Sequence, residues 1–106
     1  MSNYMRILLF FDLPVKTKKE RRDYTKFRNF LLNQGFDMMQ YSVYCRLCNG
    51  HESMERQLDN IKKVIPPKGS IRALPVTEKQ YERMRLLLGD YTTNERHITT
   101  NQLSLF

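Results

Sequence analysis

Met5–Phe11 reads MRILLFF and is followed directly by Asp12-Leu13-Pro14. The short length of this apolar run and the proline after it favour a buried strand over a helix. A capping box, Thr17-Lys18-Lys19-Glu20, comes next, in which the threonine hydroxyl and the glutamate carboxylate each accept from an exposed amide of the first helical turn. The predicted helix continues to about Asn33, and Gly35 is placed to end it.

The middle of the chain predicts strands and a second helix. Phe36–Leu47 alternates apolar and polar residues, which is strand periodicity, and forms either one long strand or a tight pair. A second amphipathic helix is stopped by Pro66-Pro67, and its apolar stripe consists of Met54, Leu58, Ile61 and Ile65. Ser70–Val76 is predicted to be a further strand.

The last part of the chain adds a short helix and a strand. Thr77–Gln80 is a second capping box, and the helix that it opens carries Tyr81, Met84 and Leu88 before Gly89. Ile98–Phe106 places Leu103, Leu105 and Phe106 on a polar background. We expect a late strand here, as a candidate for pairing with another chain.

The order of these elements predicts the fold class. Strand-helix-strand repeats in a chain of 106 residues favour an α+β, ferredoxin-like sandwich, in which an antiparallel sheet carries two main helices on one face. We expect one domain over residues 1–106, with residues 90–106 as a C-terminal extension strand. The other face of the sheet then needs a cover, which a second subunit of a homodimer would supply.

The charge of the chain is concentrated on the first predicted helix. The chain has 18 Lys and Arg against 11 Asp and Glu, and its formal net charge is +7. A basic domain of this size is a candidate for nucleic-acid binding through the phosphate backbone. The alternative is an ordinary solvated helix face, but such faces usually mix both signs of charge. We assign phosphate contacts to Lys18, Lys19, Arg21, Arg22, Lys26 and Arg28, with Arg46 and Arg72 as further candidates on strands.

Asp12 is the candidate for metal chemistry. A carboxylate at the end of a strand can bind Mg²⁺, but hydrolysis of a phosphodiester normally needs more than one carboxylate around the ion. Two subunits that meet on a two-fold axis near Asp12 would each supply one. The alternative is a turn aspartate that accepts from local amides. Ser42 and Tyr44 carry hydroxyls that either contact phosphate or are ordinary sheet residues.

The two cysteines are candidates for a zinc site, and their number also indicates the cellular compartment. Cys45, Cys48 and His51 offer three possible zinc ligands, where a structural site needs four, and residues three apart on a strand point to opposite faces. The pair does not form the disulfide framework of a secreted protein. No apolar run approaches the length of a membrane span, so we expect a cytoplasmic protein with no membrane partner.

Three stretches in register resemble the CRISPR-associated protein 2 family. They are Leu9–Pro14, with its aromatic-Asp pair; Gly35-Phe36 followed by Gln40-Tyr41-Ser42-Val43-Tyr44; and Lys68–Tyr81, which looks like the subgroup that accompanies Cas9-type (type II) systems. The resemblance implies a ferredoxin-like fold and a two-fold dimer. It also implies a role in acquiring CRISPR spacers, in which the dimer bridges integrase subunits and double-stranded prespacer DNA lies across the assembly.

The resemblance implies site residues as well. The family's aspartate corresponds to Asp12, paired across the dimer axis with its mate around one Mg²⁺, and the serine of the family's second strand corresponds to Ser42. Met38 stands where some members have an arginine, so the basic first helix is expected to take over its phosphate contacts.

Three hypotheses for function follow. The first is a homodimeric scaffold that binds prespacer DNA and bridges integrase subunits. The second is a Mg²⁺-dependent endonuclease, acting on RNA or double-stranded DNA, with Asp12 of both subunits as metal ligands. The third is a toxin-like ribonuclease of the VapD type, which shares the fold.

Overall fold

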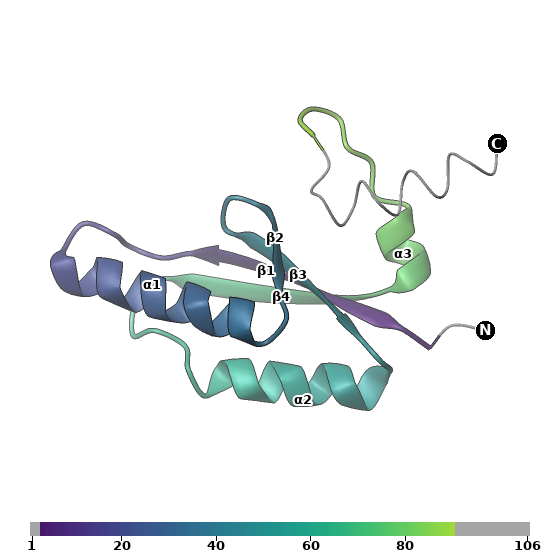
Figure 1. The fold of residues 1–106 in the computed structure, drawn as a ribbon, viewed down its shortest axis with the longest axis horizontal. Coiled ribbons are helices and arrows are strands. Elements are labelled where there is room, and N and C mark those ends of the chain that lie inside the picture. Colours follow the sequence, from purple (N-terminus) through teal and green to yellow (C-terminus); the bar gives the residue numbers. More distant parts are fainter. Residues whose placement is uncertain (1–2, 91–106) are drawn as a thin grey trace.

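A computed structural model describes residues 3–90 of the chain as one sheet with helices packed on it (Figure 1). The sheet is antiparallel, and its strand order is β2-β3-β1-β4. The predicted extension strand, residues 90–106 with Ile98–Phe106, falls almost entirely outside the described residues. The elements in chain order are β1 (Met5–Asp12), α1 (Lys18–Asn33), β2 (Asp37–Gln40), β3 (Val43–Cys48), α2 (His51–Lys62), β4 (Ser70–Thr77) and α3 (Glu78–Glu82).

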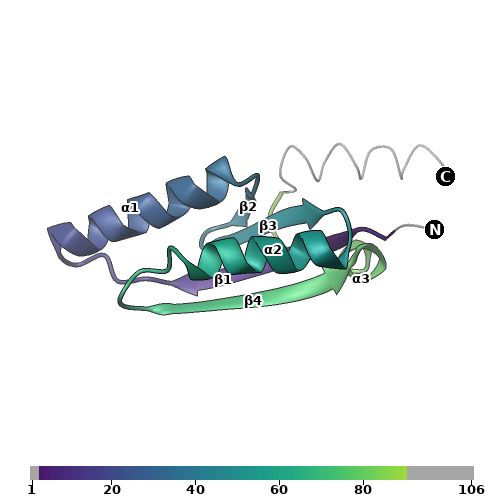
Figure 2. The ribbon, with the colours of Figure 1, turned by 90° about the horizontal axis from the view of Figure 1, so that it is seen from below.

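The core lies between the sheet and two helices. Because side chains alternate along a strand, Ile7, Leu9 and Phe11 of β1 share one face of the sheet, and all three are buried. Side chains of α1 and α2 join the same cluster, among them Phe27, Leu31, Met54 and Ile61. Figure 2 shows both helices on this side of the sheet. The prediction of an α+β sandwich with two main helices on one face is therefore confirmed.

Phe36–Leu47 forms a tight strand pair. Gln40 of β2 is opposite Val43 of β3, and the two-residue turn Tyr41-Ser42 joins them. Ser42, the second residue of this turn, has a φ of 63°, which is a left-handed backbone conformation that residues other than glycine adopt mainly in turns. The prediction that placed Ser42 on a strand beside Tyr44 is therefore wrong. Tyr44 itself faces the helices and is 1% exposed.

Two helices are shorter than predicted. The second helix, α2, ends at Lys62, so Ile65 lies beyond it and is 55% exposed. Ile65 directly precedes Pro66, and the proline ring disfavours helical backbone at that residue. The last helix, α3, ends at Glu82, before Met84 and Leu88. A helix this short depends on packing, and Leu88 has none within the described residues, since it is 93% exposed.

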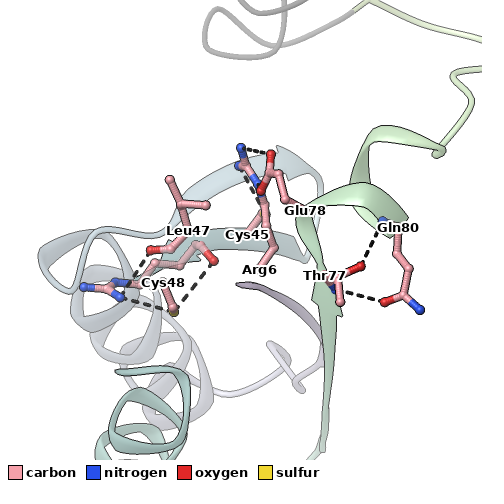
Figure 3. A network of polar contacts seen from close by, with 8 residues as sticks. Arg6, Cys45, Leu47, Cys48, Thr77, Glu78 and Gln80 are labelled. Atoms are coloured by element: carbon pink, nitrogen blue, oxygen red, sulfur yellow. Dashed lines mark hydrogen bonds and ion pairs between the residues drawn. The ribbon is translucent and has the colours of Figure 1, made fainter. Parts of the chain in front are cut away.

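An ion pair fixes α3 to the sheet. Arg6 of β1 donates from Nε and Nη2 to the two carboxylate oxygens of Glu78, at 2.9 and 3.0 Å (Figure 3). Its guanidinium also lies 4.0 Å from the ring centre of Tyr81. Burial lowers the pKa of Arg6, but the hydrogen bonds and charge of Glu78 outweigh it, so the net pKa is raised. Arg6 therefore stays charged, and this contact is a point of attachment for the C-terminal part of the fold.

The sheet face away from α1 and α2 is partly apolar. Leu8 and Cys45 are opposite each other on this face, and both are buried. Around them Phe10, Leu47 and Leu74 are 38%, 44% and 50% exposed. The described residues therefore leave several large apolar side chains of this open face accessible.

Candidate nucleic-acid interface

Four basic residues of α1 form one exposed line, which we call the α1 stripe: Lys18, Lys19, Arg22 and Lys26. The core residues Phe27 and Leu31 fix the inward side of the helix, so positions 18, 22 and 26 point away from the sheet. Lys18, Arg22 and Lys26 are four residues apart, so each lies about 6 Å further along the helix axis than the one before it. Among the described residues, no hydrogen bond or ion pair engages the side chains of the stripe. The stripe is therefore a row of cations without ion pairs, bordered by Asp23, Thr25 and Asn29.

Arg21 and Arg28, which were predicted to contact phosphate, make contacts within the protein. Arg21 donates from Nη1 to the carbonyl oxygens of Val15 and Lys16, at 3.2 and 2.9 Å. Arg28 donates from Nε to the hydroxyl of buried Tyr44 at 3.0 Å. These bonds hold the connection before α1 and tie the helix to β3. Part of the donor capacity of each arginine is therefore already used inside the fold.

Arg46 also has a structural role. Its Nε donates to the carbonyl oxygen of Gln34, just past the end of α1, at 2.6 Å. The same guanidinium lies 3.3 Å from the sulfur of Cys48. Arg46 thus satisfies a carbonyl at a helix C-terminus, where a cation also favours the helix dipole. Arg72, on β4, is exposed.

Asp12 lies at the carboxyl end of β1, with an exposed side chain. It is opposite Ser70 of β4, on the open face of the sheet. Within residues 3–90, no group of three His, Cys, Asp or Glu side chains is placed to hold a metal ion. Mg²⁺ is commonly held by one or two carboxylates together with water and phosphate oxygens. Asp12 is one carboxylate of the kind that this donor set needs.

The turn that carries Ser42 lies beside the end of β1. The amide of Phe11 donates to the carbonyl oxygen of Ser42 at 3.1 Å. Ser42 therefore lies next to Phe11, which directly precedes Asp12 in the chain. Tyr24 of α1 packs on Phe11, with ring centres 6.0 Å apart. Burial raises the pKa of the Tyr24 hydroxyl, and its interaction with Tyr41 adds to the rise, so Tyr24 is neutral at neutral pH.

Sequence reasoning missed the hydroxyl groups of Tyr24 and Tyr41. Tyr24 is part of the apolar stripe of α1, and a residue on that stripe is predicted to lie in the core. Tyr41 is 76% exposed at the hairpin turn. Only the packing of α1 over the hairpin brings these two hydroxyls together near Ser42.

The cysteines do not form a metal site in the described residues. Cys45 is on the open face of the sheet and Cys48 on the helix face, and both thiols are buried. His51 begins α2 and lies 3.6 Å from the carboxylate of Glu55. The expectation that residues three apart on a strand point to opposite faces is confirmed.

Gly69 holds the connection between α2 and β4 against the end of β1. Its φ is +109°, and a Cβ added there would lie 2.7 Å from the carbonyl oxygen of Asp12 and 2.7 Å from Cδ2 of Leu13. Real Cβ atoms do not come so close to backbone atoms, so any other residue must displace this end of the sheet. The position of Asp12 therefore depends on a glycine at residue 69.

Gly69→Ala is expected to lower the free energy of unfolding by about 2 kcal/mol, because backbone strain and a steric clash add together. Urea unfolding followed by circular dichroism would measure it. Gly89→Ala is the matched control, since Gly89 has a φ of +108° and no atom within 4 Å of an added Cβ. Equal losses in the two variants would show that the contact with Asp12 and Leu13 contributes nothing.

The family model for CRISPR associated protein Cas2 matches residues 5–84. The chain belongs to this family. The Cas2-family match contains all three stretches that carried the resemblance, from Leu9–Pro14 to Lys68–Tyr81. The assignment to the type II subgroup stays a prediction.

Curated Cas2-family relatives match most of the chain. The CRISPR-associated endoribonuclease Cas2 of Campylobacter jejuni is 48% identical over 105 residues, covering 99% of this chain and 73% of the relative. The protein of the same name from Acidovorax ebreus is 47% identical over 102 residues, covering 96% of this chain and all of the relative. That of Ligilactobacillus salivarius is 49% identical over 85 residues, covering 80% of this chain and 84% of the relative.

Proposed function

We propose that this chain acts in the acquisition of CRISPR spacers, as a homodimeric scaffold that binds double-stranded prespacer DNA and bridges integrase subunits. The observation that carries the proposal is the α1 stripe. Four exposed cations lie in a line on one helix, and none of them forms an ion pair with a described residue. Contacts of this kind bind the phosphate backbone of any sequence, as a protein that holds newly captured DNA must do.

The dimer is proposed to form through the open face of the sheet. Phe10, Leu47 and Leu74 are large apolar side chains that stay accessible there. A two-fold interface brings the same patch of two copies together, so these residues would cover one another. Asp12 is on the same face, and the two carboxylates would then approach the dimer axis.

The contact with integrase subunits is proposed to use the C-terminal segment, which lies largely outside the described residues. We propose the cytoplasm as the place of action, where the buried thiols of Cys45 and Cys48 would stay reduced. Within residues 3–90, no helix is both long and apolar enough to cross a bilayer.

A second candidate function is a Mg²⁺-dependent endonuclease, acting on RNA or double-stranded DNA. The names of the relatives, CRISPR-associated endoribonuclease Cas2, favour it. Asp12 of both subunits would hold the ion, which polarises a phosphodiester and activates water when it is bound. Ser42 is the remaining catalytic candidate, because its turn lies against the residue before Asp12. The toxin-like ribonuclease gains no support from the family match.

The deciding experiment is integration of a short DNA duplex into a CRISPR repeat by the purified integrase partner, with wild-type protein or Asp12→Ala. A scaffold needs no metal ligand, so we expect full integration with the variant. Asp59→Ala removes an exposed carboxylate from α2 and is the matched control. Loss of integration by Asp12→Ala alone, with the dimer and DNA binding intact, would replace the scaffold proposal with the enzyme.

A further inference from the structure

Two opposite charges lie near each other on the open face of the sheet, at the end where β1 finishes. Asp12 of β1 is opposite Ser70 of β4, and Phe10 is opposite Arg72, so these four side chains share one face. Asp12 and Arg72 are therefore diagonal neighbours on adjacent strands, a spacing of about 7–8 Å that long side chains can bridge. Both residues are exposed in the single chain, and β4 is an edge strand of the sheet (Figure 2).

Neither charge has an ion-pair partner in the part of the chain that the structure describes. The ion pairs among residues 3–90 all involve other side chains. Of the other charged residues on the open face, Arg6 is held by Glu78, and Asp37 is on β2, at the opposite edge of the sheet. Asp12 and Arg72 are therefore the two charges that the described chain leaves without an ion pair near the end of β1.

The proposed dimer would cover both charges. Arg72 is opposite Phe10 and two residues from Leu74, and both of these are accessible apolar side chains of the proposed interface. A charge that loses its water in an interface destabilises the complex unless an opposite charge meets it. Two Asp12 carboxylates brought near one axis would also repel each other. The interface therefore needs one cation for each carboxylate, and one anion for each guanidinium.

We propose that Asp12 of each subunit forms an ion pair with the partner subunit's Arg72. A two-fold axis repeats every contact, so the pair is made twice, once in each direction. The guanidinium can donate two parallel hydrogen bonds to the carboxylate. Each subunit then supplies the charge that the other lacks, and the dimer forms without a metal ion. The inference rests on the proposed homodimer, and it gives Asp12 a role in assembling the scaffold.

The test reverses each charge and measures the dissociation constant of the dimer by sedimentation equilibrium, with EDTA present. Asp12→Arg and Arg72→Asp each place like charges against each other across the interface. Each is expected to weaken the dimer by at least about a hundredfold. Asp59→Arg and Arg56→Asp make the same changes of charge at exposed positions of α2 and should leave the dissociation constant unchanged. Equal dimer stability in the two sets of variants would overturn the inference.

Mixing the two reversal variants shows whether the ion pair crosses the interface. In a mixed dimer, the arginine introduced by Asp12→Arg meets the aspartate introduced by Arg72→Asp, and the two native residues meet each other. We therefore expect the mixture to form a dimer nearly as stable as the wild type, while each variant alone stays monomeric. An ion pair within one chain predicts no such rescue. If the mixture stays monomeric while the double variant dimerises, the assignment across the interface is wrong.

The inference also supplies a control for the integration experiment. Asp12→Ala loses the ion pairs but adds no repulsion, so the apolar contacts of the open face still hold the dimer at high protein concentration. Arg72→Ala loosens the dimer to the same extent and removes no carboxylate. We expect equal integration by the two variants at a concentration at which both are dimeric. A loss confined to Asp12→Ala would overturn the role of Asp12 in assembly alone.

The wild-type protein separates this inference from the proposed function. A chain that stays monomeric with and without Mg²⁺ would overturn both. A dimer that forms only with Mg²⁺ would overturn the ion pairs and favour the metal site. A dimer in EDTA that the reversals leave unchanged would overturn the ion pairs and leave the scaffold standing. If the reversal variants do not fold, Asp12→Asn and Arg72→Gln each remove one charge, and each is expected to weaken the dimer roughly tenfold.

Discussion

Glu78→Ala is expected to lower the free energy of unfolding by about 3 kcal/mol, the largest loss of stability that we predict for one side chain. The side chains of Arg6 and Glu78 are only 14% and 22% exposed, and two hydrogen bonds join them. Removing the carboxylate leaves a guanidinium charge with little water around it, which costs more than the ion pair itself contributes. Chemical unfolding of purified protein would measure the loss.

Two further variants test the cause. Glu82→Ala removes an exposed carboxylate from the same helix and should change stability by less than about 0.5 kcal/mol. The double replacement of Arg6 by Met and Glu78 by Leu leaves no unpaired charge, and we expect it to be more stable than Glu78→Ala alone. If Glu78→Ala cost no more than Glu82→Ala, the ion pair would not be what attaches α3.

Neutralising the α1 stripe should have the largest effect on binding. The triple replacement of Lys18, Arg22 and Lys26 by Gln is expected to weaken binding of duplex DNA by roughly a hundredfold near 0.1 M salt. The slope of log affinity against log salt concentration should also become less negative by about 2 to 3, because fewer counterions are released. Anisotropy titrations at several salt concentrations would give both quantities.

The matched control places the same change of charge on the other main helix. Arg56, Lys62 and Lys63 are exposed residues on α2 and at its end, and their triple replacement by Gln also removes three positive charges. We expect this variant to bind with nearly the wild-type salt dependence. An equal loss in the two triple variants would mean that net charge alone, and not the stripe, governs binding.

Local features of the fold were predictable from the sequence. Both capping boxes, Thr17 with Glu20 and Thr77 with Gln80, are present, because each joins residues only three positions apart. The hairpin could not be distinguished from one long strand, since its turn contains Tyr41 and Ser42 instead of the usual Asn-Gly. Nothing in the alternating pattern around Ser42 predicts its left-handed backbone.

The candidate site was predictable only in part. The α1 stripe follows from helical spacing, and its exposure was correctly expected. The hydrogen bonds that Arg21 and Arg28 make within the protein could not be predicted. They depend on how the chain enters α1 and on the position of Tyr44 on β3. The Arg6–Glu78 pair joins residues that meet only through the register of β1 with β4, and a single sequence does not specify that register.

That register has a consequence for how the protein is made. Of the two inner strands of the sheet, β1 is the first to leave the ribosome, yet its partner on one side is β4, where Met5 is opposite Thr77. The nascent chain can pair β1 with the β2–β3 hairpin early, but one edge of β1 stays open until residue 77 has emerged. Synthesis at roughly 5–20 residues per second leaves that edge unpaired for seconds. Over this interval, the unpaired edge of β1 can pair with a neighbouring chain, so slower synthesis prolongs the risk of aggregation.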